Sequence, residues 1–120
     1  MKKKLFVLLF GLVFSSCSDL NIYSDDIIFI SKGNSQLKIT NQGDNTVYYF
    51  IVEQNTAATI NWAPGVGEPY ILSGKTVTVK YSEIYGLKTQ IVNNDTKAIF
   101  YYWIGSDNSN FTVKNIVIDL

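Results

Sequence analysis

The sequence contains no histidine and no arginine, and its 120 residues include one cysteine, one methionine and two prolines. Without histidine, the commonest general base and the imidazole ligand of zinc sites are missing. Serine–histidine–aspartate and cysteine–histidine catalytic sites are therefore excluded. A single cysteine also excludes a disulfide within the chain. Carboxylates are the main catalytic groups that remain.

The N-terminus has the plan of a secretory signal peptide. Lysines at 2–4 precede an apolar run over 5–14, which is too short to span a bilayer because spanning takes about 20 residues. The run ends in Phe14-Ser15-Ser16-Cys17, which resembles the lipobox of bacterial lipoproteins. The resemblance covers the first 19 or so residues. It implies cleavage before Cys17 and attachment of lipid to that cysteine.

This resemblance implies three parts of the chain and a location. Residues 1–16 are the predicted signal peptide, 17–25 a lipidated tether and 26–120 one domain. Several acyl chains on one N-terminus hold a protein firmly at a bilayer. We therefore expect a lipid-anchored protein of the cell envelope, on the periplasmic or the exposed face of an outer membrane. The alternative is an ordinary signal peptide with Cys17 as a bystander.

The charge of the predicted mature chain is mildly negative. Ten lysines less three in the signal leave seven, against ten acidic residues, so the net charge is −3. Nucleic acids and anionic lipids attract clustered positive charge. We therefore predict that the protein does not bind nucleic acid, and the net charge also argues against anionic lipid.

Strand patterns fill the mature region, and helix patterns are nearly absent. Apolar and polar residues alternate most clearly in Lys75 to Tyr81, as in a half-buried strand. Polar turns separate the segments at spacings near ten residues, which is typical of an antiparallel β-sandwich or a small barrel. We predict an all-β, immunoglobulin-like sandwich of seven to nine strands, with a helical turn over 82–86. The predicted strands cover 26–31, 36–40, 46–53, 57–62, 75–81, 88–92, 97–104 and 111–120.

Paired carboxylates are the surviving catalytic option. Glycosidases need two of them facing one cleft, about 5 to 10 Å apart, whereas the acidic residues here lie mostly in turns or at strand ends. Asn93-Asn94-Asp95 and the segment 107–110 offer oxygen ligands for calcium, but the same residue types are favoured in turns. We therefore predict no catalytic residues, no metal and no cofactor.

Aromatic residues are the strongest functional indication. The segments 46–53 and 97–104 are apolar on both faces, although a two-layer sandwich requires one apolar face per strand. The surplus faces either are covered or form an exposed patch, which usually marks a binding site. The candidate binding residues are Tyr48, Trp62, Tyr70, Tyr101 and Trp103. Tyr85, in or beside a loop, could extend such a surface.

These observations favour a non-catalytic protein-interaction or assembly module, with an envelope protein as partner. The alternative is a carbohydrate-binding module that uses tyrosine and tryptophan rings. A small carboxylate-based hydrolase is the third class. A flat apolar patch rimmed by charge would favour a protein partner, and a shallow groove with polar groups beside a ring would favour a glycan. The sequence leaves the oligomeric state open.

Overall fold

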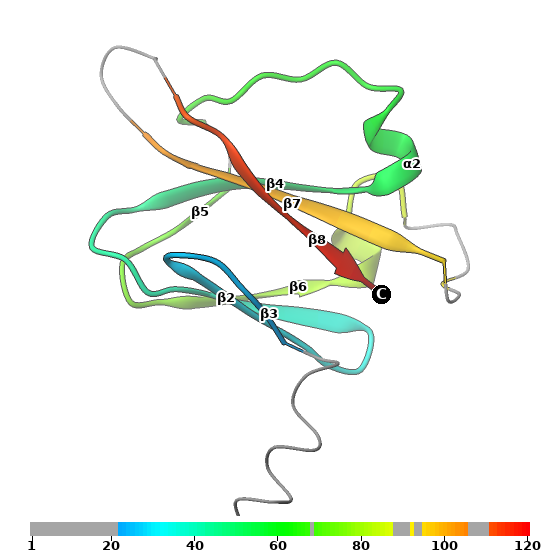
Figure 1. Ribbon diagram of the computed structural model, residues 1–120, viewed down its shortest axis with the longest axis horizontal. Coiled ribbons are helices and arrows are strands. Elements are labelled where there is room, and N and C mark those ends of the chain that lie inside the picture. The colour runs from blue at the N-terminus through cyan, green and yellow to red at the C-terminus, as the bar shows by residue number, and fades with distance from the viewer. Residues whose placement is uncertain (1–21, 68, 88–91, 93–94, 106–110) are drawn as a thin grey trace, which may run out of the picture.

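Two antiparallel sheets of four strands each face one another in the computed structural model (Figure 1). It describes residues 22–67, 69–87, 92, 95–105 and 111–120. The first sheet has the order β1-β2-β3-β6, formed by Ile22–Ser24, Ile28–Lys32, Gln36–Asn41 and Thr76–Lys80. The second sheet has the order β5-β4-β7-β8, formed by Tyr70–Ile71, Val47–Glu53, Lys97–Ile104 and Lys114–Asp119.

This architecture confirms the predicted antiparallel β-sandwich. The strands β2, β3 and β6 occupy the places of A, B and E in an immunoglobulin-type sandwich, and β5, β4, β7 and β8 those of C′, C, F and G. The chain changes sheet after β3, after β5 and after β6. As a result, β4 and β7, the two strands that are apolar on both faces, become neighbours at the centre of the second sheet.

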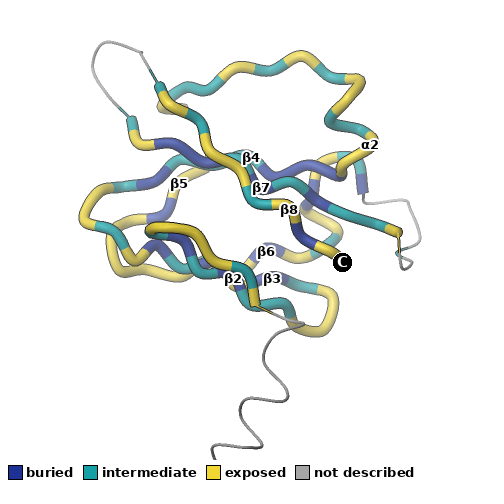
Figure 2. The backbone as a smooth tube through the Cα atoms, in the orientation of Figure 1, coloured by how far each residue is buried: buried dark blue, intermediate teal, exposed yellow. Residues whose placement is uncertain are grey.

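The core lies between the sheets, and buried residues alternate with more exposed ones along most of β2, β3 and β7 (Figure 2). Phe100 is at its centre and is fully buried. Its ring stacks on Tyr49 and on Tyr102, with centroids 5.4 and 5.6 Å apart. The aliphatic residues around it that are completely buried include Ile28, Ile30, Leu37, Ile39, Val47 and Ile118.

The strand predicted over 57–62 is wrong. The chain instead forms a short helix, α2 (Gln54–Ala57), followed by a turn and irregular structure. The buried carboxylate of Glu53 accepts hydrogen bonds from the backbone N–H groups of Asn55 (2.8 Å) and Thr56 (2.9 Å), so it caps the helix start. The cap accounts for the helix over 54–57, and the Trp62 ring then packs on Phe50 and Tyr101, so residues 58–62 do not join a sheet. Residues 54–67, named here the covering segment, then pass over the outer side of the second sheet (Figure 1).

Smaller differences concern the ends of elements. The strands β1 and β5 are not among the predicted strands, and β1 lies within the segment predicted as tether. The final strand begins at Lys114 rather than at 111, and the predicted helical turn is a 3-10 turn over Tyr81–Glu83. Most of the strand predicted over 88–92 lies outside the described residues, and so do Asn93, Asn94 and 107–110 among the possible calcium ligands. Within the described part of the chain, no helix has the length and apolar character needed to cross a bilayer.

Candidate binding surfaces

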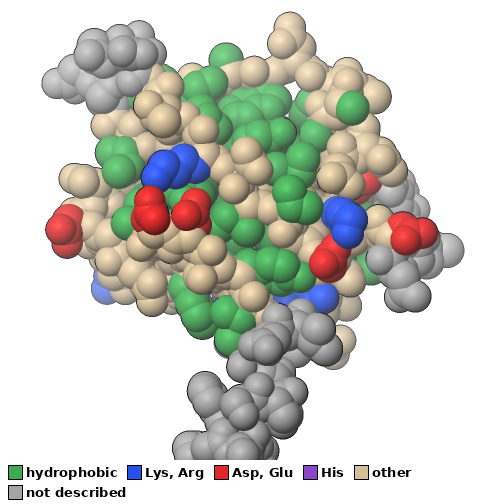
Figure 3. Space-filling model, viewed as in Figure 1, with side chains coloured by type: hydrophobic (Ala, Val, Ile, Leu, Met, Phe, Trp, Pro, Cys, Tyr) green, Lys and Arg blue, Asp and Glu red, His purple; other side chains and the backbone are tan. Residues whose placement is uncertain are grey.

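The surplus aromatic residues gather on the outer face of the second sheet. Tyr48 lies opposite Trp103 and Phe50 opposite Tyr101 in the β4–β7 register. Trp62, from the covering segment, lies over this group, with ring centroids 5.0 Å from Phe50, 4.9 Å from Tyr101 and 5.7 Å from Trp103. These five residues form the outer aromatic cluster. Figure 3 shows hydrophobic side chains filling the space between the covering segment and the strands.

Trp103 is sealed within this cluster. Its exposed fraction is 1%, and its indole N–H donates to the carbonyl of Gly65 at 3.0 Å. Gly105 lies against the same packing, because an added Cβ there would sit 2.7 Å from a ring carbon of Tyr48 and 3.1 Å from Val66. The predicted binding residue Trp103 therefore occupies a packed position with its polar atom already bonded.

The other predicted binding residues are more exposed than Trp103. Three of them are half-buried: Tyr48, Trp62 and Tyr101. Tyr70 is 56% exposed, and its ring meets the ring of Tyr48 edge-on, with the centroids 6.1 Å apart. The structure thus brings four of the predicted binding residues together and places Tyr70 at their margin. Cys17, the predicted lipidation site, lies outside the described residues.

Part of the outer aromatic cluster borders solvent on the side of β8. Asn115 lies opposite Tyr101 in the β7–β8 register and is exposed. Val117, on the same face, is 43% exposed. Trp62, Tyr101 and Asn115 therefore form an aromatic shelf, in which a polar amide lies on the strand next to an aromatic ring.

A groove of about 510 Å³ opens at the opposite edge, between β4 and β6. It exists because β5 pairs with only Val47 and Tyr48. Beyond this pairing, the Tyr49 N–H donates to Pro69 at 3.0 Å, and the Tyr85 N–H donates to Ile51 at 3.2 Å. The lining residues of this edge groove are Tyr49, Phe50, Ile51, Pro69, Thr78, Val79, Glu83 and Tyr85.

The edge groove combines aromatic and apolar walls with one carboxylate. Tyr85 is 53% exposed, and its ring lies 5.9 Å from Phe50. Burial raises the pKa of Tyr49, and the negative charge of Glu83 raises it further, so the Tyr49 hydroxyl stays protonated at neutral pH. The sequence pointed to Tyr85 as a loop residue that could extend a binding surface. It contained no signal for the groove itself, because the groove depends on which strands lie at the sheet edges.

A smaller cavity of about 270 Å³ lies at the other edge of the sandwich. Its described lining residues are Ile27, Tyr102, Trp103, Ile104, Thr112 and Lys114. Among the described lining residues of both cavities, Glu83 is the single carboxylate. Nor does any described part of the chain gather three or more potential metal-ligating side chains. The described linings of these two cavities therefore do not provide the pair of carboxylates that a glycosidase needs.

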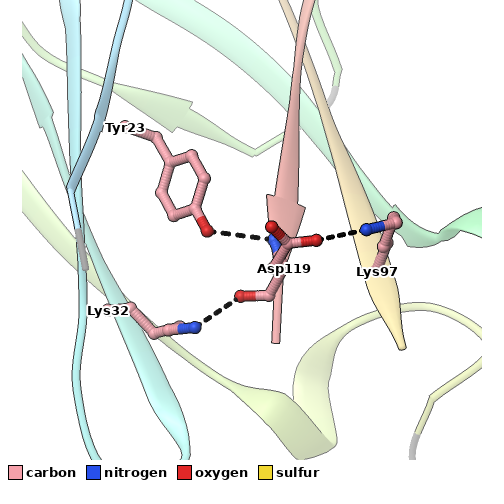
Figure 4. Close-up of polar contacts among 4 residues, drawn as sticks. All are labelled: Tyr23, Lys32, Lys97 and Asp119. Carbon is pink, nitrogen blue, oxygen red and sulfur yellow. Dashed lines mark hydrogen bonds and ion pairs between the residues drawn. The ribbon is translucent and has the colours of Figure 1, made fainter. Parts of the chain in front are cut away.

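Polar contacts join the two sheets along a seam between β1 and β8. Asp119 receives a hydrogen bond from Lys97 at its carboxylate and from Lys32 at its carbonyl (2.7 Å), while its N–H donates to the Tyr23 hydroxyl at 3.2 Å (Figure 4). The Lys97 ammonium lowers the pKa of Asp119. Asp119 therefore remains ionised under mildly acidic conditions.

The other end of the seam uses the turn between β1 and β2. The Tyr102 hydroxyl donates to Asp25 at 2.5 Å, and Lys114 pairs with Asp26 at 2.9 Å. The Tyr102 bond, followed by the Asp26 backbone N–H, lowers the pKa of Asp25. Burial, reinforced by the bond to Asp25, raises the pKa of Tyr102. The carboxylates of this turn therefore have structural roles in holding the sheets together.

The outer face of the first sheet has a different character, and we call it the bare face. In the described structure no covering segment corresponds to residues 54–67 on this side (Figure 1). Hydroxyl groups dominate it, and the hydroxyls of Thr40 and Thr76 bond to each other at 2.7 Å. Its residues are Ile22, Ser24, Phe29, Ser31, Gln36, Lys38, Thr40, Thr76, Thr78 and Lys80.

Comparison with known proteins adds no family assignment. No protein-family model, curated protein or solved structure matches this chain significantly.

Proposed function

We propose that this protein is a lipid-anchored, non-catalytic binding module of the cell envelope that docks an extended segment of a partner protein. The observation that carries this proposal is the edge groove, an aromatic-lined opening at the edge of β4 where β5 ends after two residues. The lipobox-like sequence at Cys17 supports the anchor, and the outer membrane is the proposed location.

Docking through side chains is the binding mode that suits this groove. The backbone of β4 is already bonded here, because the Tyr49 N–H donates to the Pro69 carbonyl and the Ile51 carbonyl accepts from the Tyr85 N–H. An extended peptide would therefore lie along the groove and insert alternate side chains into it, and these side chains would provide the specificity. Tyr85 offers an exposed aromatic surface of the kind enriched at interfaces, and Glu83 favours a lysine or arginine in the partner.

Site-specific photo-crosslinking tests the proposal. A benzophenone amino acid is placed at Tyr85 in the edge groove and, as a matched control, at Thr40 on the bare face. Irradiated cells should give a discrete protein adduct from position 85 and none of the same mass from position 40. Glu83→Gln should weaken that adduct. An identical adduct pattern from both positions would contradict docking in the groove.

Carbohydrate binding is the second candidate, and the aromatic shelf favours it. Half-exposed Trp62 and Tyr101 beside the Asn115 amide resemble the ring-and-amide pairing that suits a sugar. Affinity electrophoresis through envelope polysaccharides tests this candidate with the parent chain and Trp62→Phe and Asn115→Ala variants. Retardation that falls in Asn115→Ala, while Tyr85→Ala leaves it unchanged, would favour the glycan over the protein partner.

A further inference from the structure

The fold distributes the lysines unevenly between the seam and the bare face, which the net charge of the chain does not show. Three of the described lysines, Lys32, Lys97 and Lys114, bond to Asp119 or Asp26 in the seam between the sheets. Lys38 and Lys80 instead lie on the bare face, where both are exposed. None of the described residues that point outward from the first sheet is Asp or Glu. The outward side chains of these strands therefore carry two positive charges and no negative one, in a protein whose predicted mature form is negative.

The chain enters the fold beside this positive face. Ile22, the first residue of β1, points to the bare face at the edge of the first sheet and is 37% exposed. Five peptide steps separate it from Cys17, so the two Cα atoms lie at most about 18 Å apart. A lipid on Cys17 would thus hold the edge of the bare face close to the bilayer.

We propose that the bare face is the membrane-facing surface of the protein and lies against anionic phospholipid headgroups of the leaflet that holds the anchor. This inference rests on the proposed lipid anchor at Cys17. The negative surface potential of such a leaflet decays within a Debye length, about 10 Å. The short connection to Cys17 brings Lys38 and Lys80 within that range when the first sheet lies flat. Because the anchor supplies attachment, the two lysines have only to select an orientation.

The chemistry of the bare face suits a headgroup layer. Thr40, Thr76 and Thr78 present hydroxyl groups that can donate to phosphate oxygens. Phe29 adds an apolar ring, a side chain of the kind that interfacial amphipathic helices bury at the boundary between headgroups and acyl chains. In this orientation the aromatic shelf on the second sheet points away from the membrane, and the edge groove opens sideways. Both candidate binding surfaces would then remain accessible to partners.

Paramagnetic relaxation in nanodiscs tests this orientation with the full lipidated protein. A gadolinium chelate on headgroups should broaden the amide signals of Lys38 and Lys80 at least about twofold more than those of Asn115 and Val117 when about one third of the lipid is phosphatidylglycerol. In phosphatidylcholine alone the difference should shrink. The double variant Lys38→Gln/Lys80→Gln should lose it, and the charge-matched control Lys75→Gln/Lys114→Gln should keep it.

The outcomes distinguish the face from the anchor. Two results would overturn the proposed membrane-facing surface. One is that positions 38 and 80 are broadened no more than Asn115 and Val117 in either lipid. The other is that Lys38→Gln/Lys80→Gln keeps the difference between the two faces. Mass spectrometry of the cell-derived protein tests lipid on Cys17 separately. If that mass shows no lipid, the anchor proposal fails. The same relaxation experiment is then run with the Cys17 thiol coupled to a maleimide lipid, which tests the orientation by itself.

Discussion

The outer faces of the two sheets differ in composition and in how far other parts of the chain cover them. The outer face of the second sheet is aromatic, and the covering segment shields it with Trp62 and a hydrogen bond from Trp103 to Gly65. The bare face of the first sheet carries threonine, serine and lysine and has no comparable cover in the described structure. Exposed aromatic area on that scale would favour association. The comparison shows that a strand apolar on both faces can indicate a second packed layer as well as a binding patch.

The largest expected effect comes from removing the sealed ring. Trp103→Ala should lower the free energy of unfolding by about 3–5 kcal/mol, because it leaves a cavity under the covering segment. Chemical denaturation monitored by circular dichroism measures the loss. Thr78→Ala on the bare face is the matched control and should change stability by less than about 0.5 kcal/mol. Similar losses in both variants would remove the distinction between the two faces.

The second largest effect is expected at the contact between the covering segment and the loop after β6. Gly86 has φ of +85°, and an added Cβ would sit 2.4 Å from the Thr56 hydroxyl oxygen that bonds to Glu53. Gly86→Ala should therefore destabilise the protein by about 3 kcal/mol, through backbone strain and displacement of α2.

Gly74 provides the matched control for that substitution. It has a similar φ of +74°, but an added Cβ would meet nothing within 4 Å. Gly74→Ala should therefore cost about 1 kcal/mol, the strain alone. Thermal unfolding of the two variants measures the difference. Equal costs would show that contact with Thr56 does not matter.

The seam between the sheets should make stability depend on pH. The Tyr102 bond lowers the pKa of Asp25 in the folded protein. The stability this provides is therefore fully present above the ordinary pKa of aspartate and is lost as pH falls through the lower folded value. The raised pKa of Tyr102 contributes stability that is present below the ordinary tyrosine pKa and is lost as pH rises above it.

Tyr102→Phe should weaken the dependence at low pH, because the Asp26 N–H still bonds to Asp25, and should remove the dependence at high pH while keeping the ring in place. The melting temperature of this variant should fall less than that of the parent between about pH 5 and pH 3, and again above about pH 10. Asp26→Asn is the control, because it breaks the neighbouring ion pair with Lys114 and leaves the Tyr102 bond intact. Parallel pH curves for the parent and Tyr102→Phe would contradict this role.

The smallest effect is expected on the bare face. Thr40→Val and Thr76→Val remove an exposed hydrogen bond of 2.7 Å between side chains. Valine keeps the shape and the strand preference, so stability should change by less than about 0.5 kcal/mol. Thermal unfolding measures this change. A loss above 1 kcal/mol would mean that this face is structurally supported and not simply exposed, and would weaken the contrast with the second sheet.

Much of the fold could be predicted because strand signals are local. The alternation in β3 and β6 follows from side chains that point to opposite faces of a strand, and both strands are confirmed. The failure over 57–62 has an equally specific cause. A buried glutamate at position 53 caps a helix over 54–57, which turns the chain out of strand geometry just before this segment. Apolar periodicity carries no sign of a cap made by a residue inside the preceding strand.

The candidate site was less predictable. The five aromatic candidates were identified as residues, but their roles diverge between a sealed Trp103 and an exposed Tyr70. Burial of a particular ring depends on which segment lies over it, and nothing local in β7 specifies the covering segment. The edge groove was missed because it depends on β5 ending after two residues.

By itself, the sequence determined the all-β class, the poverty of catalytic groups and the surplus of aromatic faces, because composition and period-two alternation are properties of single segments. It also contains the lipobox-like segment at Cys17. Only the tertiary structure decided which aromatic face is covered, where the edge groove forms and which lysines lie in the seam or on the bare face. Those features depend on strand order, which pairs residues far apart in the chain and sets the neighbours of each face.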